Sequence, residues 1–480
     1  MFVGDGPADD APAQIEPWQR ATVFPVRYVR VPYGWPITRP STSVDEAPDQ
    51  DAAPAPGWTG HARRRSGAGM TIGGGYDLAV AASHPGESMP HRTPTGRALR
   101  IAFLVSRLDR GGTERQLIVL ARGLRERGHS VVVLVFYPGG ALEGELCDAG
   151  VRVRVLHKRG RWDLARFLFD LRRVVREERP DVLNGYLDVP NALALAARGT
   201  VRGLKVVWGL RASKVDMRCY EPSERRTTAL VSLALRALAG FPDLLIANSR
   251  AGAEHAASMG APRRRTVVIP NGIDILRLAP DRDAGRRLRR QWGVARGERL
   301  VGLVARLDPV KDHRTFLEAA ARLAAERDDV RFVCVGDGDP AYGREMQELT
   351  RVLGVGDRLH WAGVQLDMRA VYNALDVACS SSTSEGFPNV VGEAMACGVP
   401  CVVTDVGDSG WLLGQPAFTV APRDPVAMAN RVRAVLDRDP VSLERLRTDV
   451  RQRVTANFSV TTLIDRTERV MTELVGSVAR

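Results

Sequence analysis

The segment SEGFPNVVGEAMACGVP, residues 384–400, leads from a short loop into a helical pattern. The residues before it, LDVACSSST (375–383), have the apolar run and the flanking turn residues of a buried parallel strand. Pro388 is expected in the first turn of the helix, where proline is favoured. The free N–H groups of Asn389, Val390 and Val391 would then point out of the helix start, where the helix dipole favours a phosphate. The segment therefore predicts a β-loop-α unit with an anion site.

Two carboxylates flank this anion site, Glu385 in the loop and Glu393 within the helix. A carboxylate beside a phosphate is expected to accept hydrogen bonds from neutral hydroxyls, because two adjacent anions repel each other. The hydroxyls of a sugar and of a ribose meet that requirement, so the segment predicts a nucleotide-sugar site. The plainer alternative is that both glutamates are ordinary solvated charges.

The run EGFPNVVGEAMACGVPCVVTD, residues 385–405, resembles the E-x7-E signature of retaining glycosyltransferases of family 4, which have the GT-B fold. The resemblance covers residues 99–475 and implies transfer of a sugar from a nucleotide donor with retention of anomeric configuration. Four further motifs of that family occur in the expected order: GGTERQL (111–117), NSRAG (248–252), VIPNGID (268–274) and VARLDPVKD (304–312).

Alternating strand and helix patterns continue on both sides of this segment. Near Leu99, LRIAFLVSRL predicts a parallel strand, followed by a glycine turn and a helix over QLIVLARGLRERG. A second series of such patterns begins near Leu300. Repeated alternation predicts doubly wound parallel sheets with ligands at the carboxyl ends of the strands. We therefore expect the α/β class, and the resemblance implies GT-B architecture, in which two Rossmann-like domains face a cleft.

The expected division of the chain follows from these patterns and from the resemblance. Residues 98–280 are expected to form an acceptor-side Rossmann-like domain, and residues 281–460 a nucleotide-sugar-binding one. Residues 461–480 are expected to form a helix that packs back toward the first domain. Residues 1–97 are rich in Pro, Gly, Ala, Asp and Ser and show no sustained periodicity. They are predicted to be a disordered extension, because such a composition buries too little apolar area to offset the entropy of ordering.

The sequence opens with MFVGDGPADD, which lacks the basic and apolar regions of a secretory signal. The best apolar candidate for a membrane span, residues 227–241, is interrupted by Arg236 and is shorter than the roughly 20 residues that cross a bilayer. We expect a cytoplasmic protein whose six cysteines are free thiols and not metal ligands. Met89 lies just before the first strand, so residues 1–88 need not belong to the natural protein.

The resemblance assigns roles to several residues of the donor site. Arg306 and Lys311 would stabilise the leaving diphosphate, because negative charge accumulates on the phosphate oxygen as the glycosidic bond breaks. Glu385 would hold the sugar hydroxyls and Glu393 the ribose. The remaining donor-binding residues would be Gly111, Gly112, Gly386, Phe387, Pro388, Asn389 and Val390.

The first-domain side of the site departs from the family pattern. Where many members have a histidine near the donor sugar, this chain has Arg211 in WGLRAS. Arginine can contact a hydroxyl or a phosphate, but it cannot act as a base because its pKa stays above about 12. We therefore expect Arg211 to position the sugar, while a donor phosphate oxygen takes the acceptor's proton on the face of attack. The acceptor-side candidates in NGYLDVPN are Asn184, Tyr186, Asp188 and Asn191.

A metal-binding alternative comes from Asp337 and Asp339, which have the D-x-D form found in metal-dependent glycosyltransferases of another fold. The resemblance instead matches these residues to a turn that closes a strand. We expect neither a metal nor a cofactor, with the nucleotide sugar acting as a co-substrate.

The net charge of +12 comes almost entirely from arginine. Nucleic-acid binding would fit this charge, but no recognition motif accompanies it, so we expect no nucleic-acid partner. The segment 157–180 could be an interfacial helix, with Trp162, Phe167 and Leu171 in its apolar stripe. A surface helix with its stripe in the domain core is the favoured alternative. A basic first domain would still suit peripheral contact with an anionic membrane.

The sequence thus predicts a metal-independent retaining hexosyltransferase that uses a UDP- or GDP-sugar donor and a carbohydrate or lipid-linked acceptor. Two alternatives of other classes remain, a catalytically silent GT-B binding protein and a nucleotide-sugar epimerase. All four charged residues of the expected donor site are present, which disfavours the silent protein. Acceptor loops vary within such folds, so the acceptor, the donor sugar and the oligomeric state stay open.

Overall fold

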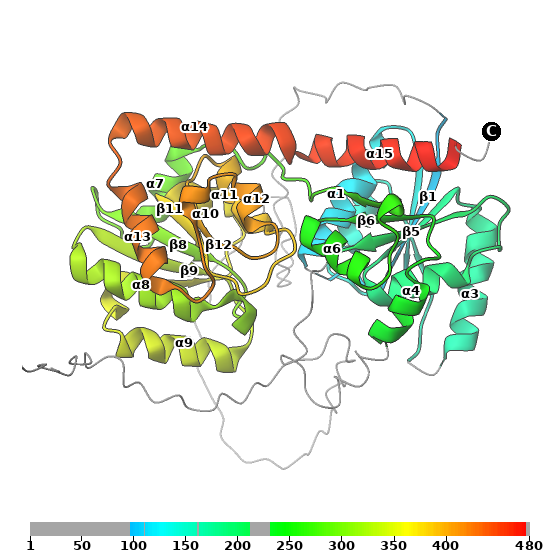
Figure 1. The fold of residues 1–480 in the computed structure, drawn as a ribbon, viewed down its shortest axis with the longest axis horizontal. Helices are drawn as coiled ribbons and strands as arrows, with labels where there is room; N and C mark the ends of the chain where they lie inside the picture. The colour runs from blue at the N-terminus through cyan, green and yellow to red at the C-terminus, as the bar shows by residue number, and fades with distance from the viewer. Residues whose placement is uncertain (1–96, 110, 161–162, 212–230, 477–480) are drawn as a thin grey trace, which may run out of the picture. The chain divides into compact units, whose positions relative to one another are not determined.

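The computed structural model of this chain describes residues 97–109, 111–160, 163–211 and 231–476. These residues form two parallel sheets with helices packed against them (Figure 1). The arrangement confirms the predicted α/β class with two Rossmann-like domains. The extension predicted over residues 1–97 lies outside the described residues, apart from Arg97.

The first sheet has seven strands in the order β3-β2-β1-β4-β5-β6-β7. The order reverses direction between β1 and β4, which is the switch point where doubly wound sheets bind ligands. Its strands are β1 (Arg100–Val105), β2 (Ser130–Val135), β3 (Arg152–Val155), β4 (Val182–Tyr186), β5 (Lys205–Leu210), β6 (Leu244–Ala247) and β7 (Thr266–Val268). Its helices are α1 (Gly112–Glu126), α2 (Glu143–Asp148), α3 (Leu164–Glu178), α4 (Asp188–Ala196) and α6 (Arg250–Ser258), joined by the C-terminal α15 (Val460–Gly476).

Each face of the first sheet has its own core, because successive side chains of a strand point to opposite faces. Along β1, Ile101 and Phe103 join a core that includes apolar residues of α1, α2 and α15. Ala102 and Leu104 join a second core with α3 and α4. The sheet is therefore buried on both faces, as its nearly uninterrupted apolar strands require.

The apolar stripe of α3 belongs to one of these cores. Phe167 and Leu171 are buried there, whereas Phe169, on the opposite side of the helix, is 68% exposed. Trp162 lies outside the described residues. The packing favours the surface-helix alternative over the interfacial one. Among the described residues, no helix combines the length and the apolar character that crossing a membrane requires.

The second sheet has six strands in the order β10-β9-β8-β11-β12-β13, with its switch point between β8 and β11. Its strands are β8 (Arg299–Val304), β9 (Val330–Val335), β10 (Leu359–Gly363), β11 (Val377–Ser380), β12 (Cys401–Thr404) and β13 (Thr419–Val420). Its helices are α7 (Arg282–Gln291), α8 (His313–Glu326), α9 (Pro340–Val352), α10 (Met368–Ala374), α11 (Asn389–Ala396), α12 (Ser409–Leu413), α13 (Pro425–Leu436) and α14 (Pro440–Asn457), with a 3-10 turn η4 (Pro309–Lys311). The core of this domain already includes Ile273 and Leu278, ahead of the expected start at residue 281.

Asp-Pro pairs mark the starts of several helices in this domain. The carboxylates of Asp339, Asp424 and Asp439 each accept hydrogen bonds from backbone N–H groups of the first turn of α9, α13 and α14. A proline follows each aspartate, at the position where its missing N–H costs nothing.

The chain passes between the two domains twice, and the two passages lie side by side. Ile273 pairs with Ser459 in an isolated parallel bridge. A Cβ on Gly272 would lie 2.8 Å from the Cα of Val460, so this turn requires glycine. After Ser459 the helix α15 packs on α1, where the Glu468 carboxylate lies 3.1 Å from the His129 ring.

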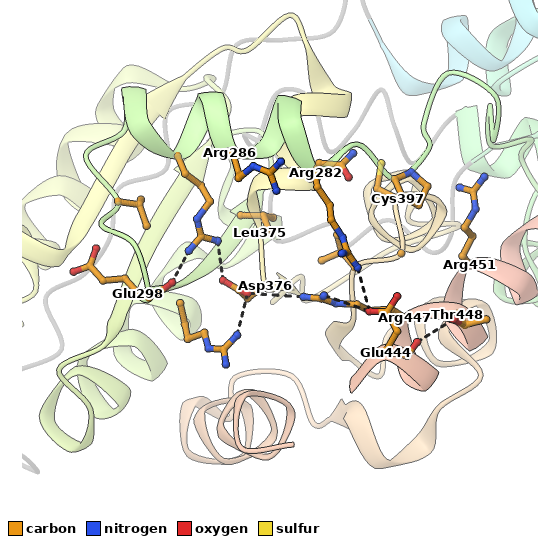
Figure 2. A pocket seen from close by; sticks show the side chains of 18 of the residues that line it. Arg282, Arg286, Glu298, Leu375, Asp376, Cys397, Glu444, Arg447, Thr448 and Arg451 are labelled. Carbon is orange, nitrogen blue, oxygen red and sulfur yellow. Dashed lines mark hydrogen bonds and ion pairs between the residues drawn. The ribbon is translucent and has the colours of Figure 1, made fainter. Parts of the chain in front are cut away.

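A cavity of about 1470 Å³ lies at the edge of the second sheet where its strands begin. Residues of α7 and α14 line it, together with Asp376, just before β11 (Figure 2). This edge is opposite to the carboxyl ends of the strands, where ligands of doubly wound sheets are expected.

Candidate functional site

The loops after β8 and β11 are fastened to each other at the switch point of the second sheet. The N–H of Thr383 donates to the carbonyl of Val310 at 2.8 Å, and the Ser381 hydroxyl donates to the carbonyl of Lys311 at 2.9 Å. The Thr404 hydroxyl, on β12, donates to the carbonyl of Ser382 at 2.6 Å. The hydroxyl-rich run after β11 is therefore hydrogen-bonded to the loop after β8 and to β12, which fixes the position of both loops.

This fastening brings two expected site residues into one ion pair. The Lys311 ammonium lies 2.6 Å from Oε1 of Glu385, and the same oxygen accepts a hydrogen bond of 2.7 Å from the Ser382 hydroxyl. The Lys311 side chain is 26% exposed and the Glu385 side chain 10%. An ammonium has three donors, so Lys311 can hold Glu385 and still donate to a ligand.

Arg306 follows β8 and reaches toward solvent, with a side chain that is 57% exposed. Its guanidinium lies 2.5 Å from Asp308, whose other oxygen accepts the N–H of Val310. Asp308 is thus held by the 3-10 turn and in turn orients Arg306. Asp308 was not predicted as a site residue, although its place in the sequence between Arg306 and Lys311 was a usable signal.

The helix α11 begins one residue later than the sequence predicts. Pro388 has ψ of 91° and lies just outside the helix as its N-cap, since this extended backbone is not helical. The N–H of Val391, expected to be free, instead donates to the carbonyl of Pro388 at 3.1 Å, because Pro388 is the N-cap and its carbonyl closes the first turn. The N–H groups of Asn389 and Val390 remain directed out of the helix start. Gly386 contributes a carbonyl that accepts the N–H of Asp408.

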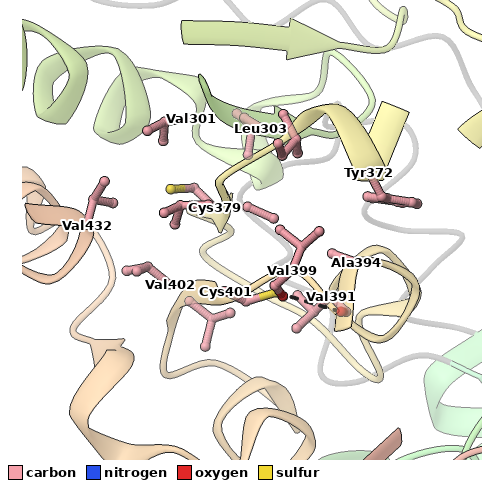
Figure 3. Close-up of a cluster of buried hydrophobic side chains, with 14 of the residues drawn as sticks. Val301, Leu303, Tyr372, Cys379, Val391, Ala394, Val399, Cys401, Val402 and Val432 are labelled. Atoms are coloured by element: carbon pink, nitrogen blue, oxygen red, sulfur yellow. Dashed lines mark hydrogen bonds between the residues drawn. The ribbon is translucent and has the colours of Figure 1, made fainter. Parts of the chain in front are cut away.

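Phe387 differs from its expected role in donor binding. It is buried in the core of the second domain, where its ring centroid lies 5.6 Å from that of Phe458. Helix α11 packs into the same core through Val391 and Ala394, which lie near Val399 and Cys401 (Figure 3). The buried ring of Phe387 therefore anchors the loop between β11 and α11 to the domain core.

Glu393 lies on α11 and is held by a residue that the sequence did not reveal. The Tyr372 hydroxyl donates to Glu393 at 2.6 Å. Burial raises the pKa of the Glu393 carboxyl, and the hydrogen bond from Tyr372 lowers it in part. Tyr372 is itself fully buried on α10, so it fixes the direction of the Glu393 carboxylate.

The glycine pair of the first domain lies at the start of α1. Gly111 is the N-cap of this helix, and its carbonyl accepts the N–H of Arg115. A Cβ on Gly112 would lie 3.2 Å from Nδ2 of Asn389. The backbone of the first domain thus comes close to the Asn389 side chain, and a Cβ at position 112 would require that amide to shift by a few tenths of an ångström.

Arg211 is buried at the end of β5 and stacks on Tyr186, with its guanidinium carbon 4.4 Å from the ring centroid. One terminal nitrogen donates to the Tyr186 hydroxyl at 2.7 Å, and the other donates to Oδ1 of Asn271 at 3.4 Å. Within the described residues, Nε of Arg211 has no hydrogen-bond partner and no carboxylate lies within ion-pairing distance of the guanidinium.

Asn271 continues this contact chain toward the donor helix, because its Nδ2 donates to Oδ1 of Asn389 at 2.8 Å. The turn that carries Asn271 is held by Gln116, whose amide exchanges two hydrogen bonds with the backbone of Gly272. Tyr186, Arg211, Asn271 and Asn389 therefore form a continuous chain of contacts. The motif VIPNGID was visible in the sequence, but its long-range partners were not.

The four acceptor-side candidates divide into different environments. Asn191 is buried, and both atoms of its amide bond the backbone of Gly209, so it holds α4 to β5. The amide of Asn184 is also buried, without a hydrogen-bond partner in the described part of the chain. Asp188 keeps exposed surface, yet partial desolvation raises the pKa of its carboxyl. It follows Leu187, whose φ of 70° is strained for a residue other than glycine.

The D-x-D residues serve the turn after β9. Asp337 accepts the N–H of Gly338 at 2.8 Å, and Asp339 caps α9 by accepting the N–H of Tyr342 at 2.8 Å. Across the described ranges, no group of three or more His, Cys, Asp or Glu side chains is placed to hold a metal ion. The two carboxylates act here as turn and cap residues.

Two protein-family models match this chain. The model described as Glycosyltransferase Family 4 matches residues 110–277, and the model described as Glycosyl transferases group 1 matches residues 298–438. The second match contains the residues on which the candidate donor site is built, Arg306, Lys311, Glu385 and Glu393.

Curated relatives are glycosyltransferases. D-inositol 3-phosphate glycosyltransferase of Geodermatophilus obscurus is 36% identical over 209 residues, which are 41% of this chain and 46% of the relative. 2-deoxystreptamine glucosyltransferase of Streptomyces kanamyceticus is 31% identical over 225 residues, which are 46% of this chain and 57% of the relative. The chain thus spans about half the length of these relatives.

Solved structures show the same fold. The crystal structure of HepE from Anabaena in complex with UDP superimposes with a TM-score of 0.68 at 23% sequence identity. The match covers 78% of this chain and 100% of HepE. With a family 4 domain on the first sheet and a group 1 domain on the second, this chain belongs to the family 4 and group 1 glycosyltransferases and has their GT-B fold.

Proposed function

We propose that this enzyme transfers a hexose from a nucleoside-diphosphate sugar to a hydroxyl acceptor with retention of anomeric configuration. The observation that carries the proposal is the Lys311–Glu385 ion pair next to the N-terminus of α11. A cation for the diphosphate and a carboxylate for the sugar hydroxyls are thereby held at one place. UDP-sugars are the first donors to test, since HepE was solved with UDP.

The diphosphate would lie at the start of α11, where the N–H groups of Asn389 and Val390 favour an anion. Lys311 and Arg306 would donate to its oxygens. As the bond from the sugar to the phosphate breaks, the negative charge that develops on the leaving oxygen is stabilised by both cations. This supports a reaction that needs no resident metal, because the Asp337 and Asp339 carboxylates already bond backbone N–H groups.

The acceptor hydroxyl would attack the anomeric carbon on the face that the diphosphate leaves. Because attack and departure occur on the same face, the new bond keeps the original configuration. The proton of the acceptor hydroxyl would pass to a phosphate oxygen of the departing diphosphate. Arg211 cannot take that proton, since a guanidinium stays charged at working pH. Its role would be to hold the sugar, from a position fixed by Tyr186 and Asn271.

The test combines a binding screen with a transfer assay. UDP-, GDP- and ADP-sugars are screened by thermal shift, and the donor that binds is then offered with carbohydrate and lipid-linked acceptors. The anomeric configuration of the product is read by NMR, with and without excess chelator. Binding without transfer to any acceptor would favour the silent protein, and conversion of the donor without acceptor would favour the epimerase. Activity that chelator abolishes and Mn²⁺ restores would overturn the metal-independent step.

A further inference from the structure

The cavity between α7 and α14 (Figure 2) shares no lining residue with the candidate donor site. Its lining includes Leu375 and Asp376, which precede β11, and Gly398 and Val399, which follow α11. The donor site instead uses the residues after β11 and before α11. The two sites therefore lie at opposite ends of the same strand and helix.

The cavity carries a large excess of positive charge. Eight arginines line it, and they outnumber its three carboxylates, Glu298, Asp376 and Glu444, by five. Arginine is common throughout this chain, so composition alone predicts exposed guanidiniums. Composition does not predict that so many of them converge on one concave surface, where low-dielectric walls focus the positive potential.

The carboxylates of the cavity are shared among several guanidiniums. Asp376 lies 2.8 Å from Arg289, 3.5 Å from Arg299 and 3.9 Å from Arg447. Glu444 is shared in the same way, at 3.6 Å from Arg282 and 3.7 Å from Arg447. One carboxylate neutralises one guanidinium, so the ion pairs within the cavity leave positive charge uncompensated.

Some of these arginines hold the fold. Arg289 bonds the carbonyl of Ala374 at 2.9 Å, and Arg451 bonds the carbonyl of Ala396 at the end of α11. Two others, Arg290 and Arg296, are exposed on the cavity wall. No carboxylate of the described residues lies within ion-pairing distance of either. They are the guanidiniums best placed to meet a ligand.

We propose that this cavity binds a ligand that carries two or more phosphate groups. Guanidinium matches phosphate through paired hydrogen bonds, and an unbalanced cluster of guanidiniums is stabilised by a polyanion. The volume exceeds the range of about 300 to 1,000 Å³ typical of small-molecule sites, so it has room for more than one phosphate. The phosphates belong either to a soluble metabolite or to clustered lipid headgroups. The proposal does not depend on the proposed transferase reaction.

The probe is inorganic tripolyphosphate, titrated by calorimetry into the full chain carrying Lys311→Ala, which weakens the separate donor site. The test variant adds Arg290→Gln and Arg296→Gln. The matched control adds Arg344→Gln and Arg431→Gln, two exposed arginines that do not line this cavity. We expect tripolyphosphate to bind at least about tenfold more weakly to the test variant than to the control. Circular dichroism melts verify that all variants fold.

A second arm uses vesicles with and without phosphatidylglycerol in a sedimentation assay. Tripolyphosphate binding that depends on Arg290 and Arg296 identifies a soluble ligand. Vesicle binding with the same dependence, in the absence of tripolyphosphate binding, identifies lipid headgroups. Binding of neither probe, or equal binding by the test and control variants, overturns the proposal.

Discussion

The Lys311 ammonium and the Glu385 carboxylate meet at 2.6 Å although 74 residues separate them in the chain. They meet because Lys311 follows β8 and Glu385 follows β11, and these strands are hydrogen-bonded neighbours in the middle of the sheet. The loops after the two strands therefore emerge together at the switch point. The fold places a cation and a carboxylate where a nucleotide sugar would need both.

Replacing Lys311 tests whether this cation acts on the leaving group. Lys311→Ala should lower kcat by roughly 10² to 10³, because a preorganised charge is lost where negative charge develops. Lys158→Ala is the matched control, since Lys158 is also a largely buried lysine in an ion pair, at 2.7 Å from Asp163. Steady-state kinetics with the donor identified by the screen gives both values. Similar losses in the two variants would contradict the assignment of Lys311.

Removing the hydroxyl of Tyr186 tests the chain of contacts that runs from Tyr186 through Arg211 to Asn271. Tyr186→Phe keeps the ring on which Arg211 stacks but removes the 2.7 Å hydrogen bond. We expect kcat/KM to fall about 2- to 13-fold, which corresponds to one hydrogen bond of about 0.5 to 1.5 kcal/mol. Tyr137→Phe, on the same domain, is the control and should retain full activity. An unchanged kcat/KM in Tyr186→Phe would remove Arg211 from the site.

The pair Tyr372–Glu393 predicts a pH effect on donor binding. Burial already raises the pKa of Glu393, and the Tyr372 hydroxyl opposes that shift by stabilising the charged form. Tyr372→Phe should raise the pKa further. If ionised Glu393 accepts from the ribose, the acid limb of the profile of donor affinity against pH should move to higher pH. Tyr342→Phe, whose hydroxyl bonds the N–H of His313 instead of a carboxylate, should leave that limb in place.

The sequence predicted the parallel sheets because apolar strands and turn residues are local signals. It also predicted that Lys311 and Glu385 lie at the same edge of the sheet, since each follows such a strand. It did not reveal that the ring of Phe387 lies in the core, because a motif does not show which side chain of a loop turns inward. Asn271 was missed as a link, because its contacts with Arg211 and Asn389 join three distant segments. Such contacts depend on tertiary packing and leave no local pattern.

His313 predicts an acid-sensitive component of stability. It is buried beside Lys311 and packs near Trp361 and Tyr342, and burial lowers its pKa from 6.5 to about 4. Between these values the unfolded chain binds a proton that the folded chain does not. The free energy of unfolding should therefore decrease as pH falls from 6.5 to 4, by up to about 3 kcal/mol from this residue.

His313→Phe removes the titrating group while keeping a ring at this position. Urea unfolding of the wild-type protein and the variant across that pH range should show a smaller decrease for the variant. His360→Phe is the control, because it replaces an exposed histidine by the same ring. Parallel curves for wild type and His313→Phe would show that His313 titrates normally in the folded protein.

The substitution Gly285→Ala tests how closely α7 packs on α10, because the packing decides whether the free energy of unfolding rises or falls. Alanine is favoured over glycine within helices by up to about 1 kcal/mol, so Gly→Ala ordinarily stabilises a helix. A Cβ at Gly285, however, would lie 2.1 Å from the backbone oxygen of Asn373, which cannot move without displacing α10. Gly285→Ala should therefore destabilise the protein by about 1 to 3 kcal/mol.

Gly144→Ala in α2 is the control, because nothing lies within 4 Å of its Cβ position. It should leave the free energy of unfolding unchanged or raise it by about 0.5 kcal/mol. Equal stabilisation of the two variants in urea unfolding would mean that α7 and α10 are not packed this closely.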